Sequence, residues 1–212
     1  MRKFLIVSLG FLLLGGVTSA TVINSVHDFS TGSSGVAATA AAAEQEVCKF
    51  CHAPHNNQPA LLSSPLWNHD FGTTATFTVY ASDTMDGAPA DIAIGGDNPS
   101  YLCMSCHDGT VAIGQLVNET IDMDTNGNLD DPGDFLVGTL ALGADLSNDH
   151  PVNFDATADT TITVPATYPL FGVGNLMHCA TCHDAHDNTG NPILLRGTLP
   201  NSQICMDCHT TK

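Results

Sequence analysis

The sequence predicts a chain that is mostly loop, with a few short helices and minor strands wrapped around covalently attached prosthetic groups. Three observations support this fold class. One motif, Cys-x-x-Cys-His, occurs four times in the 212 residues. Gly, Asn, Asp, Pro and Thr fill most of the segments between the motifs. Long aliphatic clusters are few, so the polypeptide alone would bury only a modest core, and the attached groups would form much of the interior.

The four motifs use every cysteine of the chain. Cysteines three residues apart on one helical turn point the same way, so both thiols can add to the two vinyl groups on one edge of a porphyrin. A zinc site or a disulfide framework would not require a histidine after every second cysteine. The motifs therefore predict four haem c groups, as in a multihaem cytochrome c. The thioether cysteines would be Cys48, Cys51, Cys103, Cys106, Cys179, Cys182, Cys205 and Cys208.

Ten histidines are available for eight axial positions on four irons. The histidine that closes each motif is the expected proximal ligand. A histidine at every distal position as well would give six-coordinate iron with no open site, which favours electron transfer over catalysis. His178, which precedes Cys179, is interpreted as a surface or packing residue. The proximal ligands would be His52, His107, His183 and His209, and the distal candidates are His27, His55, His69, His150 and His186.

Residues 1–20 have the pattern of a secretory signal peptide, with a basic start, an apolar run and small residues before the expected cleavage site. The expected mature chain, 21–212, is exported and not inserted in a membrane. Its basic residues would be Lys49, Arg196 and Lys212, against 22 acidic residues. Such a charge excludes nucleic acid and anionic lipid as partners and favours basic redox proteins or cations.

Composition and capping signals predict the short elements in chain order. The Ala-rich stretch Val36–Cys51 is expected to be a helix that carries the first motif. Asn98 and Pro99 predict the start of the helix that carries the second motif, and Pro200 that of the last helical turn. The expected strands are Thr73–Tyr80, Phe135–Leu142 and Thr160–Val164.

An internal repeat predicts one domain built from two dihaem units. Cys48–Asn57 aligns with Cys179–Asn188, each with a histidine three residues after the proximal one. Ser100–His107 aligns with Ser202–His209. The units would span about 21–117 and 150–212, with an acidic loop insertion at 118–149.

A second metal signal lies in this insertion. The carboxylate and amide side chains follow the spacing of the first nine positions of an EF-hand calcium loop, but Gly133 stands where the closing glutamate is expected. The alternative is a solvated acidic turn. The candidate Ca²⁺ ligands are Asp122, Asp124, Asn126, Asn128 and Asp130.

Beyond the motifs themselves, three segments carry a resemblance to a known family: Val26–Phe29, Pro65–His69 and Asp149–Val152. Together with the motifs they resemble multihaem cytochromes of dissimilatory metal-reducing bacteria, above all the extracellular tetrahaem filaments of the OmcE-like cytochrome nanowires. The resemblance implies a homopolymer whose bis-His haems form one continuous stack. It also implies that His27 crosses between subunits to bind an iron.

Three functional hypotheses follow. The first is a non-enzymatic filament subunit at the cell surface or outside the cell that conducts electrons to external acceptors. The second is a shuttle in the periplasm or on the outer surface that does not polymerise. The third, a haem reductase, would require an open iron site and an active-site cation for an oxyanion substrate, and the scarcity of basic residues argues against it.

Overall fold

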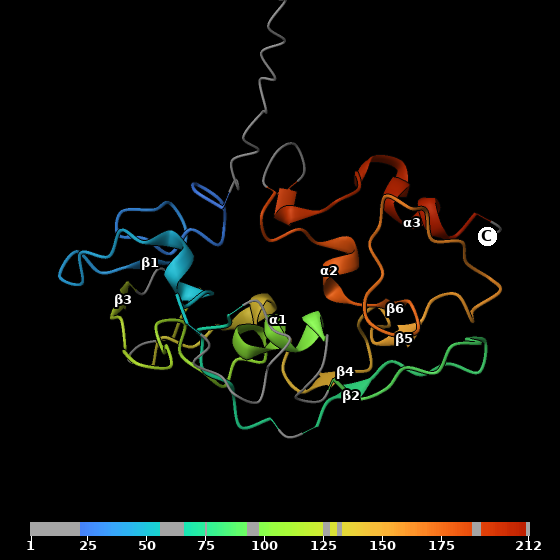
Figure 1. Cartoon of the computed structure of the whole chain (residues 1–212), viewed down its shortest axis with the longest axis horizontal. Helices are drawn as coiled ribbons and strands as arrows, with labels where there is room; N and C mark the ends of the chain where they lie inside the picture. The colour runs from blue at the N-terminus through green and yellow to red at the C-terminus, as the bar shows by residue number, and fades with distance from the viewer. Residues whose placement is uncertain are drawn as a thin grey trace, which may run out of the picture.

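The computed structural model describes residues 22–55, 66–74, 76–92, 98–124, 128–130, 133–187 and 192–210. The expected signal peptide, residues 1–20, lies outside this part of the chain. Loops and turns prevail among the described residues and the regular elements are short, which confirms the predicted mostly-loop fold (Figure 1). None of the helices in the described ranges has the length and apolar character needed to cross a membrane.

The described helices are short, and each described strand has two residues. The α-helices are α1 (Pro99–His107), α2 (Cys179–Cys182) and α3 (Gln203–Cys208), and the 3-10 helices are η1 (Val47–Phe50), η3 (Gly138–Leu140), η4 (Pro192–Leu194) and η5 (Pro200–Ser202). The strands are β1 (Ala37–Ala38), β2 (Thr78–Val79), β3 (Met123–Asp124), β4 (Asp145–Leu146), β5 (Phe154–Asp155) and β6 (Leu176–Met177). Pairs β1–β3 and β5–β6 are antiparallel, and β2–β4 is parallel. These ladders fasten loops to one another and do not form an extended sheet.

Helix α1 begins where the sequence predicts. The Asn98 side chain accepts a hydrogen bond from the backbone N–H of Tyr101 at 3.3 Å, and Pro99 occupies the first helical position. Both features suit the start of a helix. The Asn98 side chain accepts a backbone N–H that has no partner within the helix, and proline has no backbone N–H that needs one. The prediction at Pro200 is also close, since η5 leads directly into α3.

The helix predicted over Val36–Cys51 is wrong except for its last turn, η1. Ala37 and Ala38 are buried and pair with β3 instead. The intrinsic helix preference of alanine is worth less than 1 kcal/mol per residue, roughly. Burial in the cluster around Phe29 and Met123, together with the strand pairing, outweighs this preference.

Two of the three strand predictions are also wrong. In Phe135–Leu142 the chain forms two isolated bridges and then the 3-10 turn η3. Thr160–Val164 contains no strand, and its Thr163 bonds to the fourth motif. Among the described residues of Thr73–Tyr80, only β2 is a strand. In each case a few contacts with distant segments replace an extended ladder.

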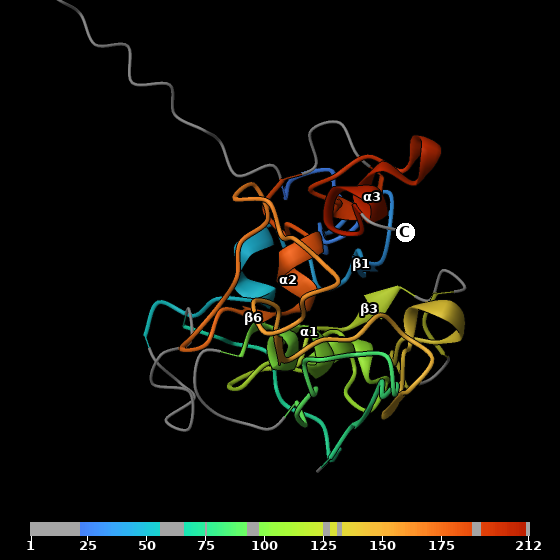
Figure 2. The same cartoon turned by 90° about the vertical axis from the view of Figure 1, so that its right-hand side faces the viewer.

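The four motif-bearing segments follow one another along the long axis of the molecule in chain order. Figure 1 shows η1 in cyan on the left, then α1 and α2, with α3 in red on the right, and Figure 2 shows α2 beside α1 in the perpendicular view. Buried apolar side chains of the described residues form three separate clusters and not one continuous core. The chain thus surrounds a row of motifs.

Candidate haem-binding sites

Each motif lies on a short helix that brings its two cysteines onto one turn. The motifs lie on η1, on the C-terminal half of α1, on α2 and on α3. The backbone N–H groups of His52, His183 and His209 donate to the carbonyl of the first cysteine of their own motif at 2.8 or 2.9 Å. All eight cysteines are free thiols, so no disulfide competes for the sulfur atoms.

Thiols of successive motifs interact in chain order. Burial raises the pKa of Cys51 and that of Cys182 to about 11. The neighbouring Cys103 thiol lowers the pKa of Cys179 to about 7. The interacting pairs are Cys51 with Cys106, Cys103 with Cys179, and Cys182 with Cys208. Groups attached to these sulfurs would therefore lie close together at these three junctions.

Backbone carbonyls from distant loops orient two of the proximal imidazoles. His107 Nδ1 donates to the Leu140 carbonyl at 2.8 Å, and His183 Nδ1 donates to the Ile193 carbonyl at 3.0 Å. A metal-bound histidine usually donates its second ring N–H to a carbonyl or carboxylate in this way. The bond leaves Nε2 to face a metal. Sequence reasoning missed Leu140 and Ile193, and no side-chain signal could reveal them, because they act through the main chain.

A segment from outside each motif lies beside the last residues of that motif and forms a backbone hydrogen bond with them. A backbone N–H from that segment donates to the carbonyl of the second cysteine in the first, third and fourth motifs, and to that of His107 in the second. These contacts hold the proximal histidine by its own backbone, so its orientation does not depend on helix length. The four donors are Asn68, Leu142, Thr163 and Arg196.

Three of the four proximal imidazoles lie beside a second imidazole from elsewhere in the chain. The ring centroids are 6.0 Å apart in the pair His52–His186, 6.3 Å in His27–His107 and 6.4 Å in His150–His209. Two imidazoles on opposite sides of one metal ion, each bonded at about 2 Å, place their centroids about 6 Å apart. The spacing fits coordination of one iron between the two rings of each pair.

His27 belongs to a folded segment of the chain. The neighbouring Phe29 packs on Phe50 with ring centroids 5.4 Å apart, and its carbonyl accepts a bond from Ala38. Burial, with a smaller contribution from the nearby His107, lowers the pKa of His27 to about 4. The ring is therefore neutral at neutral pH, which is the form that binds metal.

His150 is held by a backbone carbonyl, as His107 and His183 are. Its Nδ1 donates to the Pro151 carbonyl at 3.0 Å, which leaves Nε2 free of that bond, and its ring lies beside that of His209. Burial lowers the pKa of His150 and thus also favours the neutral ring. His209 differs, because its buried Nδ1 has no hydrogen-bond partner among the described residues.

The remaining candidate distal ligands are placed differently. His55 is exposed. His69 is buried, and its two ring nitrogens lie 2.8 Å and 3.0 Å from the carbonyl oxygens of Asp70 and Ala112. Both ring nitrogens are thus at hydrogen-bond distance from backbone carbonyl oxygens. His178, interpreted from sequence as a surface or packing residue, is almost completely buried.

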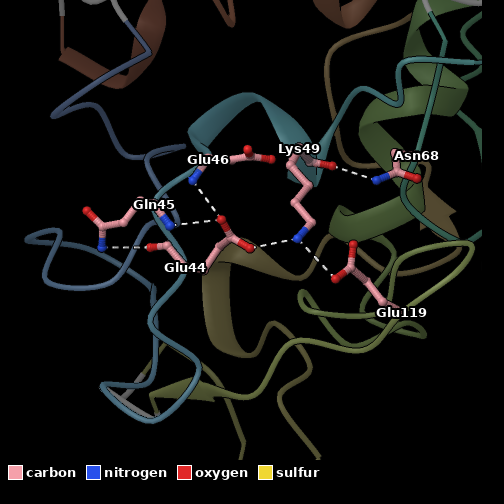
Figure 3. A network of polar contacts seen from close by, with 6 residues as sticks. All are labelled: Glu44, Gln45, Glu46, Lys49, Asn68 and Glu119. Atoms are coloured by element: carbon pink, nitrogen blue, oxygen red, sulfur yellow. Dashed lines mark hydrogen bonds and ion pairs between the residues drawn. The ribbon is translucent and has the colours of Figure 1, made fainter.

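The two basic residues that lie in the described part of the chain both contact motif regions. Lys49, inside the first motif, forms ion pairs with Glu44 at 2.7 Å and Glu119 at 3.0 Å, and its carbonyl accepts a bond from the Asn68 side chain (Figure 3). The bond to Glu44 raises the pKa of Lys49. Arg196 pairs with Asp184 at 2.7 Å and donates to the Ala180 carbonyl in the third motif. Both cations are thus already neutralised at the motifs.

The predicted calcium loop is described only in part, because Asn126 lies outside the described residues. Asp130 accepts a bond from the Phe135 backbone N–H at 2.7 Å, as in a simple acidic turn. Asp124 pairs with Ala37 in the β1–β3 ladder. Within the described ranges, no three His, Cys, Asp or Glu side chains converge at ion-binding distance. Calcium binding remains a prediction.

Comparison with known families agrees with the chemistry of the motifs. The family described as the doubled CXXCH motif matches residues 172–212, which contain the third and fourth motifs. A paired motif of this kind indicates a multihaem c-type cytochrome with covalently bound haem c and a role in electron transfer. No curated protein matches the chain.

Proposed function

We propose that this protein is a non-enzymatic electron carrier with four covalent haem c groups, each bound between two histidines. The observation that carries the proposal is the set of three imidazole pairs at 6.0–6.4 Å, each with one histidine from a Cys-x-x-Cys-His motif. When bound, each haem supplies an iron that cycles between Fe(III) and Fe(II). The chain holds the porphyrin by two sulfurs, orients the rings through carbonyls and keeps substrate away from the iron.

The pairs support a distal ligand for each of three motifs. His186 would complete the iron of His52, His27 that of His107, and His150 that of His209. The repeat extends the assignment to His183, because His55 and His186 occupy equivalent positions after their motifs. If His186 serves the first motif, the reciprocal pair is His55 with His183. His69 is then the unassigned fifth candidate.

Replacement of His27 tests this assignment, with His69 as the matched control. His27→Ala should convert one haem of four to a high-spin form that binds carbon monoxide, because the iron of His107 loses its sixth ligand. His69→Ala should keep every haem low-spin, although it removes a buried side chain. Optical and EPR spectra of the purified holoproteins report both results. A high-spin haem in His69→Ala, with none in His27→Ala, would contradict the assignment.

Carbon monoxide also separates the electron carrier from the haem reductase. The wild-type protein should form no carbonyl complex on reduction, because every iron would have two histidine ligands. A stoichiometric complex in the wild type would mean that at least one haem has an open position. Haem counting by intact mass decides the number of groups independently of this result.

The finer proposal, a conducting OmcE-like filament at the cell surface or outside the cell, rests on the resemblance. Two structural facts bear on it. The segment that carries His27 packs within its own chain, so ligand sharing between copies would require exchange of this segment. The exposed large apolar side chains include Val173, Ile193 and Leu199, which could lie between subunits. The alternative remains a non-polymerising shuttle that docks basic partners through its acidic surface.

Negative-stain electron microscopy decides between filament and shuttle. We expect filaments in wild-type protein isolated from its host's outer surface. Filaments that disappear in His27→Ala would indicate an exchanged segment with a shared ligand. Filaments that persist would indicate polymerisation through surface contacts alone. Uniform small particles in both proteins would favour the shuttle, and isolation from the periplasm would support that location.

A further inference from the structure

His178 makes contacts that no haem ligand role explains. It precedes the first cysteine of the third motif, where the other motifs have Val47, Leu102 and Ile204. The imidazole is 1% exposed, and its Nδ1 lies 2.9 Å from Ser100 Oγ. A polar ring therefore occupies a position that is apolar in the rest of the repeat.

Ser100 joins the second motif to the third. It lies in the first turn of α1, is fully buried, and accepts the backbone N–H of Cys179 at 3.1 Å. That N–H belongs to the first turn of α2, which has no partner for it within its own helix. Ser100 thus caps α2 from a different helix. Thr181 completes the cap, because its hydroxyl accepts the His178 backbone N–H at 3.0 Å.

The imidazole of His178 is held on one side only. Ser100 Oγ lies 2.9 Å from its Nδ1 and also accepts the Cys179 backbone N–H. The Nε2 atom of His178 is buried without a hydrogen-bond partner in the described part of the chain, beside the ring of Phe171. An apolar residue would avoid that unsatisfied group, so the bond to Ser100 is the contribution that distinguishes histidine here.

The bond lies next to the sulfurs of both motifs. Ser100 is one helical turn before Cys103, and His178 directly precedes Cys179. The thiols of these two cysteines lie close enough for each to shift the pKa of the other. The second and third motifs belong to different dihaem units of the repeat, so this contact is one of the places where the two units meet, as is the pair His52–His186.

We propose that Ser100 and His178 form a clamp that sets the distance between the second and third haems, and that electron exchange between these two haems depends on it. The inference rests on the proposed haem sites. Both residues are positioning residues, because neither binds iron. The clamp acts through the sulfur-bearing ends of α1 and α2, which it holds together.

Five variants of the holoprotein test the clamp. Ser100→Ala and His178→Leu remove the bond, and their double variant measures whether the two effects share one cause. His178→Asn retains a polar atom near the position of Nδ1 and serves as the conservative rescue. Ser202→Ala is the matched control, because Ser202 has the equivalent position before the fourth motif and is exposed. The readout is the rate of electron exchange between haems, from NMR line widths of haem methyl signals in partly reduced protein.

We expect several-fold slower exchange in Ser100→Ala, His178→Leu and the double variant, with no additional loss in the double. His178→Asn and Ser202→Ala should exchange at the wild-type rate. Haem count and low-spin spectra should be unchanged throughout. Equal exchange rates in all variants, or a high-spin haem in His178→Leu, would overturn the clamp. If His178→Leu does not fold, the exchange rate of Ser100→Ala alone tests the clamp. Failure of the proposed haem sites would instead appear in the wild-type haem count and spectrum.

Discussion

At the scale of single residues, the fourth motif is tied to the chain by one hydrogen bond between side chains. Tyr168 is buried, and its hydroxyl donates to the Asp207 carboxylate, inside the motif, at 2.5 Å. This bond is the main reason that the pKa of Asp207 is lowered, with a smaller contribution from Gln203. A carboxyl whose pKa is lower in the folded state stabilises the fold above its ordinary pKa of 3.8 and loses that contribution as the pH falls.

Tyr168→Phe should therefore destabilise the protein at neutral pH and have a smaller effect below the ordinary pKa of aspartate. Protonation of Asp207 removes the charge that strengthens the bond, so the two proteins should converge in acid. Urea unfolding at several pH values measures the difference. Tyr80→Phe is the control. A difference between wild type and Tyr168→Phe that is the same at every pH would mean that lost packing, and not the bond, causes the effect.

Some of the site's residues were readable from sequence and others were not. The cysteines and proximal histidines follow from spacing, because attachment chemistry fixes it. The partners of His27 and His150 did not follow, since contacts between distant segments leave no local pattern. His69 and His178 show the same limit. Both are isolated histidines in sequence, and their roles depend on carbonyl or hydroxyl groups supplied by α1 and by the loop that follows it.

At the scale of elements, α1 is the best-specified part of the chain, because its start depends on local chemistry. Asn98→Ala should lower the free energy of unfolding by about 1 kcal/mol, since it removes the acceptor for the Tyr101 N–H. Asn98→Asp should retain most of that stability, because aspartate is an equally good cap. Denaturant unfolding measures both variants. Equal losses in the two would show that the cap bond is not the stabilising feature.

The failed prediction of a helix over Val36–Cys51 shows that tertiary contacts can outweigh the intrinsic helix preference of a segment. Alanine favours helix only weakly, and an isolated helix of that length is marginal in water. Ala38 is fully buried next to Met123, and Phe29 accepts its backbone N–H. Those contacts come from segments far apart in sequence, so composition could not indicate them.

The acidic turn after β3 carries the calcium prediction. If Ca²⁺ binds there, chelation should lower the thermal unfolding midpoint, because a bound ion stabilises only the folded state. Asp124→Asn should then abolish the response to chelation. Calorimetry with EDTA, and then with added Ca²⁺, measures this. An unchanged midpoint in both conditions would leave the turn as the solvated acidic alternative.

At the scale of the whole molecule, the dominant electrostatic feature is the excess of acidic over basic residues. The full sequence has a formal net charge of −17. The cations Lys49 and Arg196 are both engaged in ion pairs, and haem propionates would add further negative charge. Self-repulsion of this kind opposes the compact state and is screened over about 8 Å at physiological ionic strength.

Added sodium chloride should therefore raise the unfolding midpoint. We expect a rise of about 2–4 °C between about 0.01 M and 0.15 M salt, which corresponds to about 1 kcal/mol for a chain of this size. The same salt weakens the Lys49 pairs, which are worth at most about 1 kcal/mol each because they are partly exposed. Lys49→Gln should thus show a larger rise than wild type. Measurement in EDTA separates screening from calcium binding, and a midpoint that falls with salt in both proteins would show that ion pairs outweigh repulsion.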